Sequence, residues 1–258
     1  MLVTSILLRA ASHPYLADHE IGGTPVVPVA LVLEWFAAAA ADRPKPLVLR
    51  RTNVLRKISL TGFRAAGDRY AVRREVTGPD LGLTLVDDNG LPHYRASVTR
   101  NEALEPSAPW TVPSGLRPPP RLNTYDGNVL FHGPAFRSIK RFHGLSPTGA
   151  VGVVVGLREL GWPDDGWHTD PPAVDGGIQL AVLWAEQVIG AATLPMSVRE
   201  FRVHRPGPFP GPVRGFVRRR RADALSAECD IGFVGVDGVP RLELVGVSLI
   251  ARPDGATR

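Results

Sequence analysis

Two long apolar runs dominate the hydrophobic pattern of the chain. They cover residues 28–41 and 175–192, and each contains a single acidic residue in its interior, Glu34 and Glu186. Apolar side chains cover most of the helical circumference of both runs, and a helix of this kind must be wrapped by other structure. The sequence therefore predicts two buried helices.

Strand-like segments flank both predicted helices. They are rich in β-branched residues, often alternate apolar with polar positions, and are separated by turn signals such as "DDNGLP" and "VDG". They cover residues 2–9, 46–60, 69–76, 81–87, 93–100, 150–160, 197–205, 212–221, 225–236 and 241–252. The order of strands, buried helix and further strands thus occurs twice.

A proline-rich stretch, residues 106–123, lies between the two halves and predicts an extended connector. The simplest architecture is an α+β fold of two modules, residues 1–115 and 116–258. Each module is expected to be a curved antiparallel sheet wrapped around one long helix.

Composition narrows the class of protein. Of 258 residues, 44% are hydrophobic and 21% charged, which describes a globular chain with an ample core. The single cysteine, Cys229, excludes an intrachain disulfide, so we expect a buried thiol and a reducing, cytoplasmic location. Residues 1–8 and 28–41 are too short to span a membrane.

The net charge is +5, and its one dense cluster is Arg218–Arg221. Neither zinc-ligand spacing nor an aromatic-interleaved basic stripe accompanies this cluster, so nucleic-acid binding is not expected. Two interpretations remain for the cluster: a solvated turn, or a docking surface for an acidic protein partner.

The first stretch with candidate chemistry is "HPYLADHEIGGTPVVP", residues 13–28. His19, Gly23 and Pro28 follow the spacing H-x-x-x-G-x-x-x-x-P. Gly23 permits an unusual backbone dihedral or a close approach, and Pro28 suits the first turn of the helix that follows. A neutral His19 held there can accept a proton near pH 7; the alternative is an ordinary hydrogen-bonded loop histidine.

The second stretch is "DGGIQ", in which Asp175 and Gln179 share one helix face at i and i+4. Asp175 is a candidate general acid that Gln179 orients, or alternatively a helix N-cap. A helix N-terminus favours the charged carboxylate, so an acid here would need burial to keep its proton.

The third stretch is "LFHGPAF", residues 130–136. Gly133 and Pro134 predict a turn that exposes the Gly133 amide, which is suited to bind a carbonyl oxygen that gains charge. His132 is either catalytic or structural, and Phe136 closes the motif.

In this order and spacing, the three stretches resemble the dehydratase domains of polyketide synthases and of polyunsaturated fatty acid synthases. The family signatures HxxxGxxxxP, GYxYGPxF and DxxxQ/H are matched by residues 19–28, 129–136 and 175–179. "HPYLADHEI" and "LPMSVREFRVHRPGP" also look like this family. The resemblance implies a double hot-dog fold, which agrees with the two wrapped helices.

The resemblance also implies roles. His19 would be the base, Asp175 the acid, Gln179 its support, and the Gly133 amide the binder of the thioester carbonyl. The implied reaction removes water from a 3-hydroxyacyl thioester carried on the phosphopantetheine arm of an acyl carrier protein. No metal or redox cofactor is expected. Other domains of a multienzyme synthase, and a second copy in a homodimer, are further candidate partners.

The chain departs from the family at three positions. Leu130 and His132 replace the two tyrosines of the second motif, and Val29 stands where many relatives have glycine. The "FHGP" form favours the iterative and polyunsaturated-type enzymes. None of these changes touches His19, Asp175 or Gln179.

Three alternatives stay open within the same fold: a double-bond isomerase, a cyclase, and a product-template domain that folds a polyketide. From another class, the chain would be a scaffold module that only docks carrier protein. Retention of the three polar groups argues against the scaffold.

Overall fold

The structure is a computed structural model that describes residues 2–99, 106–119, 124–125, 127, 129–164 and 166–252. The first half contains β1 (Leu2–Leu8), the 3-10 helix η1 (Pro14–Asp18), β2 (Glu20–Ile21), β3 (Thr24–Pro25), α1 (Val29–Ala39), β4 (Leu47–Val54), β5 (Asp68–Thr77), β6 (Asp80–Asp87) and β7 (Pro92–Val98). The second half contains η2 (Pro134–Phe136), β8 (Ile139–Ser146), β9 (Gly149–Val154), α2 (Pro171–Ile189), β10 (Thr193–Val203), β11 (Val213–Ala222), β12 (Ser226–Val234) and β13 (Pro240–Ala251).

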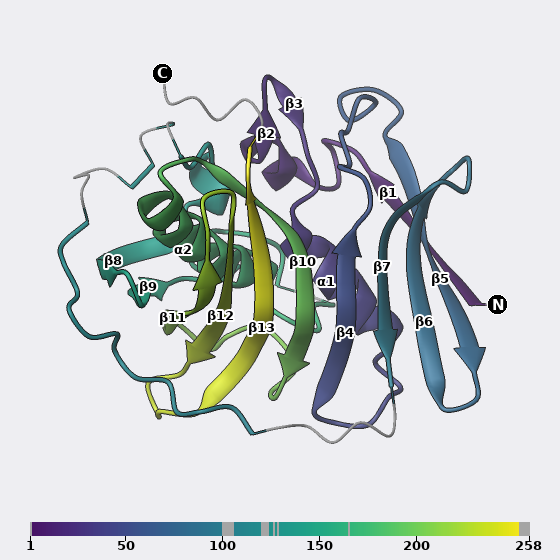
Figure 1. The fold of residues 1–258 in the computed structure, drawn as a ribbon. Helices are drawn as coiled ribbons and strands as arrows, with labels where there is room; N and C mark the ends of the chain where they lie inside the picture. Colours follow the sequence, from purple (N-terminus) through teal and green to yellow (C-terminus); the bar gives the residue numbers. More distant parts are fainter. Residues whose placement is uncertain are drawn as a thin grey trace.

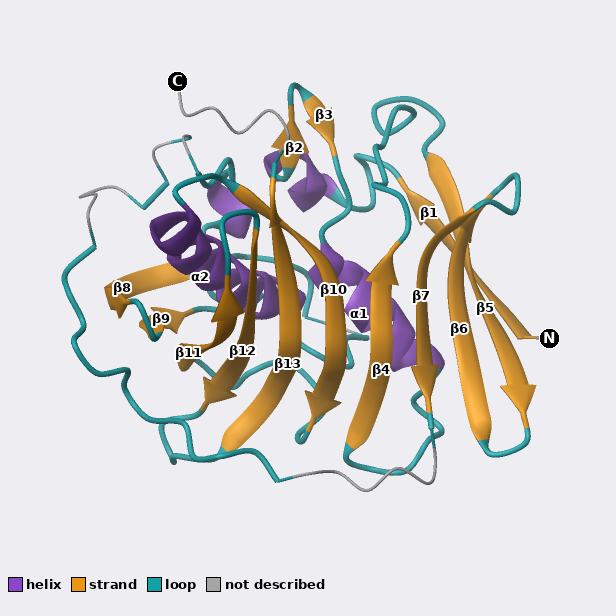
Figure 2. Cartoon of the chain, in the orientation of Figure 1, coloured by secondary structure: helices purple, strands orange, loops and turns teal. Residues whose placement is uncertain are grey.

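One antiparallel sheet of eleven strands runs through the described part of the chain, in the order β1-β5-β6-β7-β4-β10-β13-β12-β11-β9-β8. Both halves contribute a contiguous block of strands, and the pairing of β4 with β10 joins the blocks. Figure 1 shows the sheet curving around α1 and α2, and Figure 2 shows the same two helices behind the strands. The two sheets expected from the sequence are therefore fused edge to edge.

The first predicted helix is confirmed with slightly different ends. Helix α1 begins at Val29, after Pro28 as its N-cap, and ends at Ala39 rather than residue 41. Glu34 is only 2% exposed. It accepts hydrogen bonds from the His168 N–H (2.8 Å) and the Thr169 hydroxyl (2.5 Å), so α1 holds the loop that leads into α2.

The second predicted helix starts four residues earlier than expected. Pro171 and Pro172 occupy the first two helical positions, where an N–H is not needed, and Asp170 is the N-cap. The alternative interpretation of Asp175 as the N-cap is therefore wrong. The helix ends at Ile189 because Gly190 adopts a left-handed conformation (φ 80°).

Two adjacent glycines allow α2 to pack closely on the sheet. A Cβ at Gly177 would lie 2.3 Å from the Phe233 ring, and one at Gly176 would lie 2.7 Å from Ser138 Cβ. These contacts explain why glycine is present inside a helix despite its low propensity there.

The connector packs on the second half. The Ser107 hydroxyl and the Trp110 indole N–H donate to Glu243 at 2.8 and 2.6 Å. The boundary at residues 115/116 stays a prediction, although residues 107 and 110 already contact strand β13.

The arginine cluster is not a solvated turn, as one interpretation of the sequence held. Arg218–Arg221 lie within strand β11, and three of them form ion pairs. Arg218 and Arg220 pair with Asp230, and Arg221 pairs with Glu228. Cys229 is a free, fully buried cysteine, as expected. Neither helix in the described ranges is long and apolar enough to cross a membrane.

Candidate active site

A short hairpin positions His19. Strands β2 and β3 pair through a turn in which Gly22 and Gly23 both have positive φ, 60° and 78°. A Cβ at Gly23 would meet nothing within 4 Å, so the site needs this glycine for its backbone conformation and not for close approach. Pro28 immediately precedes α1 instead of lying in its first turn.

The imidazole of His19 is fixed in one orientation. Its Nδ1 lies 2.8 Å from the carbonyl oxygen of Val26, which only accepts hydrogen bonds, so Nδ1 bears the proton. In the neutral ring, Nε2 is then unprotonated. Burial lowers the pKa of His19 to about 4, and the nearby Asp175 carboxylate only partly offsets this effect. The ring is thus neutral at pH 7 and able to accept a proton.

Asp175 lies in the second turn of α2 and is 4% exposed. Its Oδ2 accepts a hydrogen bond from Gln179 Nε2 at 2.6 Å and lies 3.3 Å from His132 Nε2. Burial acts to raise the pKa of Asp175, but the hydrogen bonds and charges of its neighbours outweigh it and hold the pKa below its ordinary value. The resting carboxylate is therefore ionised, which contrasts with the protonated acid expected from the sequence.

Gln179 connects Asp175 to the motif that carries His132. Its Nε2 also donates to the Phe136 carbonyl oxygen (2.8 Å), and its Oε1 accepts from the Tyr125 hydroxyl (2.7 Å). The Tyr125 oxygen accepts in turn from the Ile139 N–H (2.7 Å). Sequence reasoning missed Tyr125, because a lone tyrosine after the connector gives no spacing signal.

The Gly133 amide is not available to hold a thioester carbonyl, contrary to the expectation. Its N–H donates to the Asp18 carbonyl oxygen at 2.7 Å, and the Asp18 carboxylate accepts from the Ala135 N–H at 2.7 Å. A Cβ at Gly133 would lie 2.5 Å from Asp18 Oδ1. Asp18, the residue before His19, is thus tied to the turn that follows His132, and Gly133 leaves room for its side chain.

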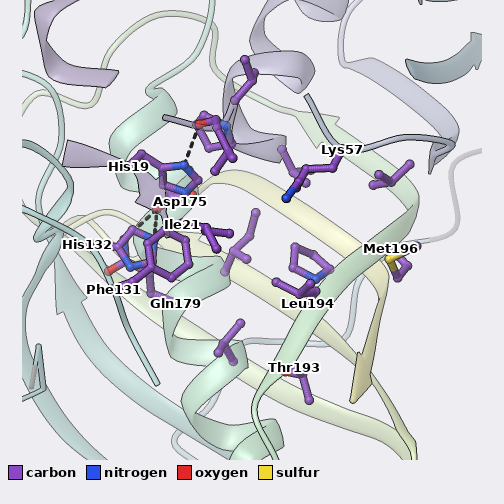
Figure 3. A pocket seen from close by; sticks show the side chains of 18 of the residues that line it. His19, Ile21, Lys57, Phe131, His132, Asp175, Gln179, Thr193, Leu194 and Met196 are labelled. Atoms are coloured by element: carbon purple, nitrogen blue, oxygen red, sulfur yellow. Dashed lines mark hydrogen bonds and ion pairs between the residues drawn. The ribbon is translucent and has the colours of Figure 1, made fainter. Parts of the chain in front are cut away.

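The polar groups converge on one cavity of about 240 Å³. Of the residues predicted for the site, His19, Pro28, His132, Asp175 and Gln179 line it, as seen in part in Figure 3. Gly23, Gly133 and Phe136 do not line it, and Gly23 is exposed in the turn between β2 and β3. The remaining wall is mainly apolar and includes Val27, Val29, Tyr94, Ile178, Val182 and Leu194.

His19, His132 and Asp175 form a compact cluster in which one side-chain atom of each lies within 4.8 Å of the others. Such a separation would suit a metal ion by distance alone. His19 Nδ1 is, however, bonded to Val26, and Asp175 Oδ2 is engaged by Gln179 and His132. Hydrogen bonds therefore account for the cluster, and we assign no metal to it.

We expect Gly133→Ala to lower kcat about ten- to a hundredfold while KM changes little. The new methyl group would displace Asp18, and with it His19, and a 1 Å misplacement costs up to about a hundredfold. Alanine keeps the amide N–H that donates to Asp18, so a loss of activity would be due to the clash of the new methyl group with the Asp18 side chain. Gly211→Ala is the matched control, since a Cβ there meets nothing within 4 Å. Unchanged turnover in Gly133→Ala would show that the tether to Asp18 is dispensable.

Comparison with known proteins agrees with this arrangement. Residues 118–258 match the family described as "Polyketide synthase dehydratase N-terminal domain", and residues 2–73 match "Polyketide synthase dehydratase domain". A polyunsaturated fatty acid synthase of Thraustochytrium sp. (strain ATCC 26185 / S-3) is 28% identical over 242 residues. The alignment covers 85% of this chain but only 8% of that relative.

Solved structures share the fold. The dehydratase domain of a mycocerosic acid synthase-like polyketide synthase superposes with a TM-score of 0.79 at 18% identity, covering 99% of this chain and 92% of that one. The dehydratase domain from the CurF module of curacin polyketide synthase gives 0.79 at 17% identity, covering 97% and 93%. The double hot-dog fold expected from the sequence is confirmed. The chain therefore belongs to the dehydratase domains of polyketide synthases, lyases that remove water from 3-hydroxyacyl thioester intermediates.

Proposed function

We propose that the chain dehydrates a 3-hydroxyacyl thioester on an acyl carrier protein, with His19 as base and Asp175 as acid. The observation that carries the proposal is the convergence of these two side chains, from different halves of the chain, on one mainly apolar cavity. His19 Nε2 removes a proton from Cα, which the thioester carbonyl acidifies. Loss of the β-hydroxyl as water then yields the 2-enoyl thioester.

The N-terminus of α1 is the best binder for the charge that builds on the thioester oxygen. The first N–H groups of a helix have no intrahelical acceptor and carry a partial positive charge. Val29 is the first residue of α1 and lines the cavity beside His19. We assign its amide the role expected of Gly133.

Two solved structures with the same fold give further support. Both are described as inactive mutants of the CurK dehydratase, one with a histidine replaced by phenylalanine and the other with an aspartate replaced by asparagine. A histidine and an aspartate are also the two groups to which we assign the chemistry here. We propose that the reaction needs no cofactor, since the phosphopantetheine arm belongs to the carrier.

Carrier docking is better placed at the cavity mouth than on Arg218–Arg221. Arg56 and Lys57 line the cavity and are exposed, and Figure 3 shows Lys57 among the side chains that line it. Three of the four arginines in the cluster Arg218–Arg221 instead form ion pairs with acidic neighbours. Cations at the mouth suit an acidic carrier and the phosphate of its arm.

We expect reversal of both mouth charges, Arg56→Glu with Lys57→Glu, to lower kcat/KM for a carrier-bound substrate about tenfold at low salt. The same variant should process a short thioester without carrier at the wild-type rate. Arg219→Glu with Arg221→Glu changes the net charge equally and is the matched control. If kcat/KM for the carrier-bound substrate fell only in the Arg219/Arg221 variant, the carrier would dock on Arg218–Arg221 and not at the cavity mouth.

Mass spectrometry of a 3-hydroxyacyl carrier incubated with the protein tests the function directly. Loss of one water with an enoyl product supports the dehydratase. An isomerase or a cyclase acts on an enoyl thioester, so a carrier-bound 2-enoyl substrate is assayed separately; a shifted double bond or a new ring in its released acyl chain, at unchanged mass, would identify one of them. An unaltered 3-hydroxyacyl substrate that still binds would identify a docking scaffold. A product-template role would require a polyketide substrate that cyclises in the presence of the protein.

The cellular setting follows from the same proposal. Other domains of a multidomain synthase are partners of this family, and we propose a carrier protein among them, acting in the cytoplasm. A homodimer stays a prediction that the mass of the protein in solution would test.

A further inference from the structure

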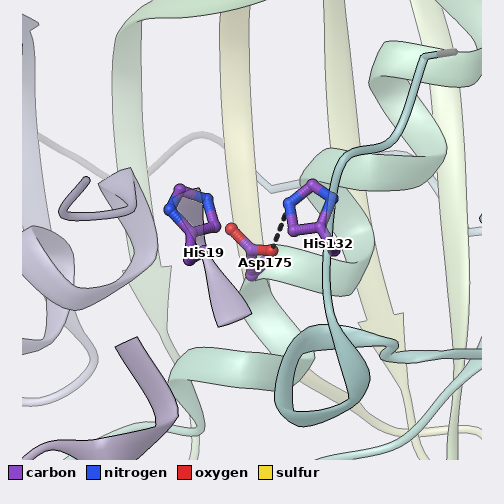
Figure 4. Close-up of side chains that lie close together, drawn as sticks. All are labelled: His19, His132 and Asp175. Carbon is purple, nitrogen blue, oxygen red and sulfur yellow. Dashed lines mark ion pairs between the residues drawn. The ribbon is translucent and has the colours of Figure 1, made fainter. Parts of the chain in front are cut away.

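His132 occupies a position that the mechanism above does not use. It is 8% exposed and its ring stacks on Phe131, with ring centroids 4.4 Å apart. Its Nε2 lies 3.3 Å from Asp175 Oδ2, and within the described ranges its Nδ1 has no hydrogen-bond partner. Figure 4 shows Asp175 between the two imidazoles of His19 and His132.

The 3.3 Å contact between His132 Nε2 and Asp175 Oδ2 needs a proton. An ionised carboxylate has lone pairs only, so contact with the His132 ring requires a proton on Nε2 or on Oδ2. Gln179 supplies a second N–H to the same oxygen and cannot give it up. The transferable proton of the carboxyl is therefore the one that it shares with His132.

We propose that His132 stores the proton that Asp175 delivers to the leaving hydroxyl, so that the acid of the reaction is the His132–Asp175 pair. The inference rests on the proposed dehydration. It assigns His132 a positioning role, because its proton reaches the substrate only through Asp175.

The proton count closes within the cluster. In the proposed resting state His19 is neutral, and His132 Nε2 and Asp175 Oδ2 share one transferable proton. His19 takes the α-proton as the Cα–Cβ double bond forms and the C–O bond breaks. The proton shared by His132 and Asp175 joins the departing oxygen to make water. His19 is then the imidazolium, and return of its proton to His132, whose ring centroid lies 5.1 Å away, restores the site.

Few other charged groups face His132. Asp175 approaches from α2 and His19 from the loop before β2. The Arg137 side chain donates to the His132 carbonyl oxygen (3.4 Å), and the Tyr125 hydroxyl lies beyond Gln179. Lys57 lines the same cavity. None of these, apart from His19 and Asp175, contacts the His132 ring through a hydrogen bond or ring contact in the described structure.

Two substrates distinguish a role of His132 in proton delivery from a role in packing. A 3-hydroxyacyl thioester needs a proton on its leaving group, whereas chloride leaves a 3-chloroacyl thioester without one. His132→Gln keeps an N–H for Asp175 but cannot transfer a proton. We expect this variant to dehydrate the hydroxy substrate at least about a hundredfold more slowly, and to eliminate chloride within about threefold of wild type. His143→Gln, at an exposed position on β8, should match wild type on both.

Equal losses on both substrates in His132→Gln, or wild-type dehydration by that variant, would overturn the proposal. Failure of wild-type protein to eliminate from either substrate would instead refute the dehydratase function itself.

Discussion

His19→Ala is expected to lower kcat for dehydration about a hundred- to ten-thousandfold, because the α-proton then has no acceptor. Turnover of wild-type protein should stay constant on the acidic side until the pH approaches about 4. The pKa of His19 lies near that value, and below it the ring is protonated and cannot act as a base. Stopped-time assays of a 3-hydroxyacyl carrier across pH measure both effects.

The control for this variant is His143→Ala, which removes an exposed imidazole on β8. In His19→Ala itself, loss of the hydrogen bond to Val26 should lower the free energy of unfolding by about 1 kcal/mol, which is a change of a few degrees in Tm for a chain of this size. Near-normal turnover in folded His19→Ala would end the proposed mechanism.

Asp175→Asn should remove most turnover as well, and the double variant with His19→Ala should be barely worse than either single change. The two groups act in one elimination, so each has little to assist once the other is absent, and such effects are strongly non-additive. Rates of the three variants on one carrier substrate provide the measurement. If the loss in the double variant equalled the product of the losses in the two single variants, His19 and Asp175 would instead act independently.

Changing the N-cap of α2 should lower stability, whereas changing Asp175 should lower activity. Asp170 and not Asp175 caps α2, so Asp170→Ala should cost about 1 kcal/mol or more in unfolding free energy. Asp175→Asn should leave the melting temperature close to that of wild type. Thermal melts run beside the activity assays separate these two aspartates.

Local sequence signals predicted most of the fold. Both helices followed from apolar runs, and the ten predicted strand segments correspond to ten of the observed strands. Strand β8 was missed because the exposed polar residues Lys140, Arg141 and His143 interrupt the apolar pattern of "IKRFHGLS". The start of α2 was missed because a proline pair resembles a break, although proline fits the first helical turn.

The site was predictable in its members but not in its contacts. Spacing identified His19, Asp175 and Gln179, and the hydrogen bond from Gln179 to Asp175 follows from i and i+4 geometry. The partner of the Gly133 amide is Asp18, more than a hundred residues away, and no local pattern encodes such a pairing. The contact of His132 with Asp175 is likewise a product of tertiary packing.

The register of the β4–β10 pair sets how the two halves of the chain, and with them His19 and Asp175, are placed relative to each other. Arg50 faces Glu200 across this pair and forms an ion pair with it, which marks one register. Because side chains alternate along a strand, the smallest slip that keeps the same face inward is two residues, or about 7 Å. That step exceeds the 4.8 Å that spans His19, His132 and Asp175. Insertions or deletions in either strand are therefore expected to separate base from acid, and chimaeras that join halves of different synthases must preserve this register to work.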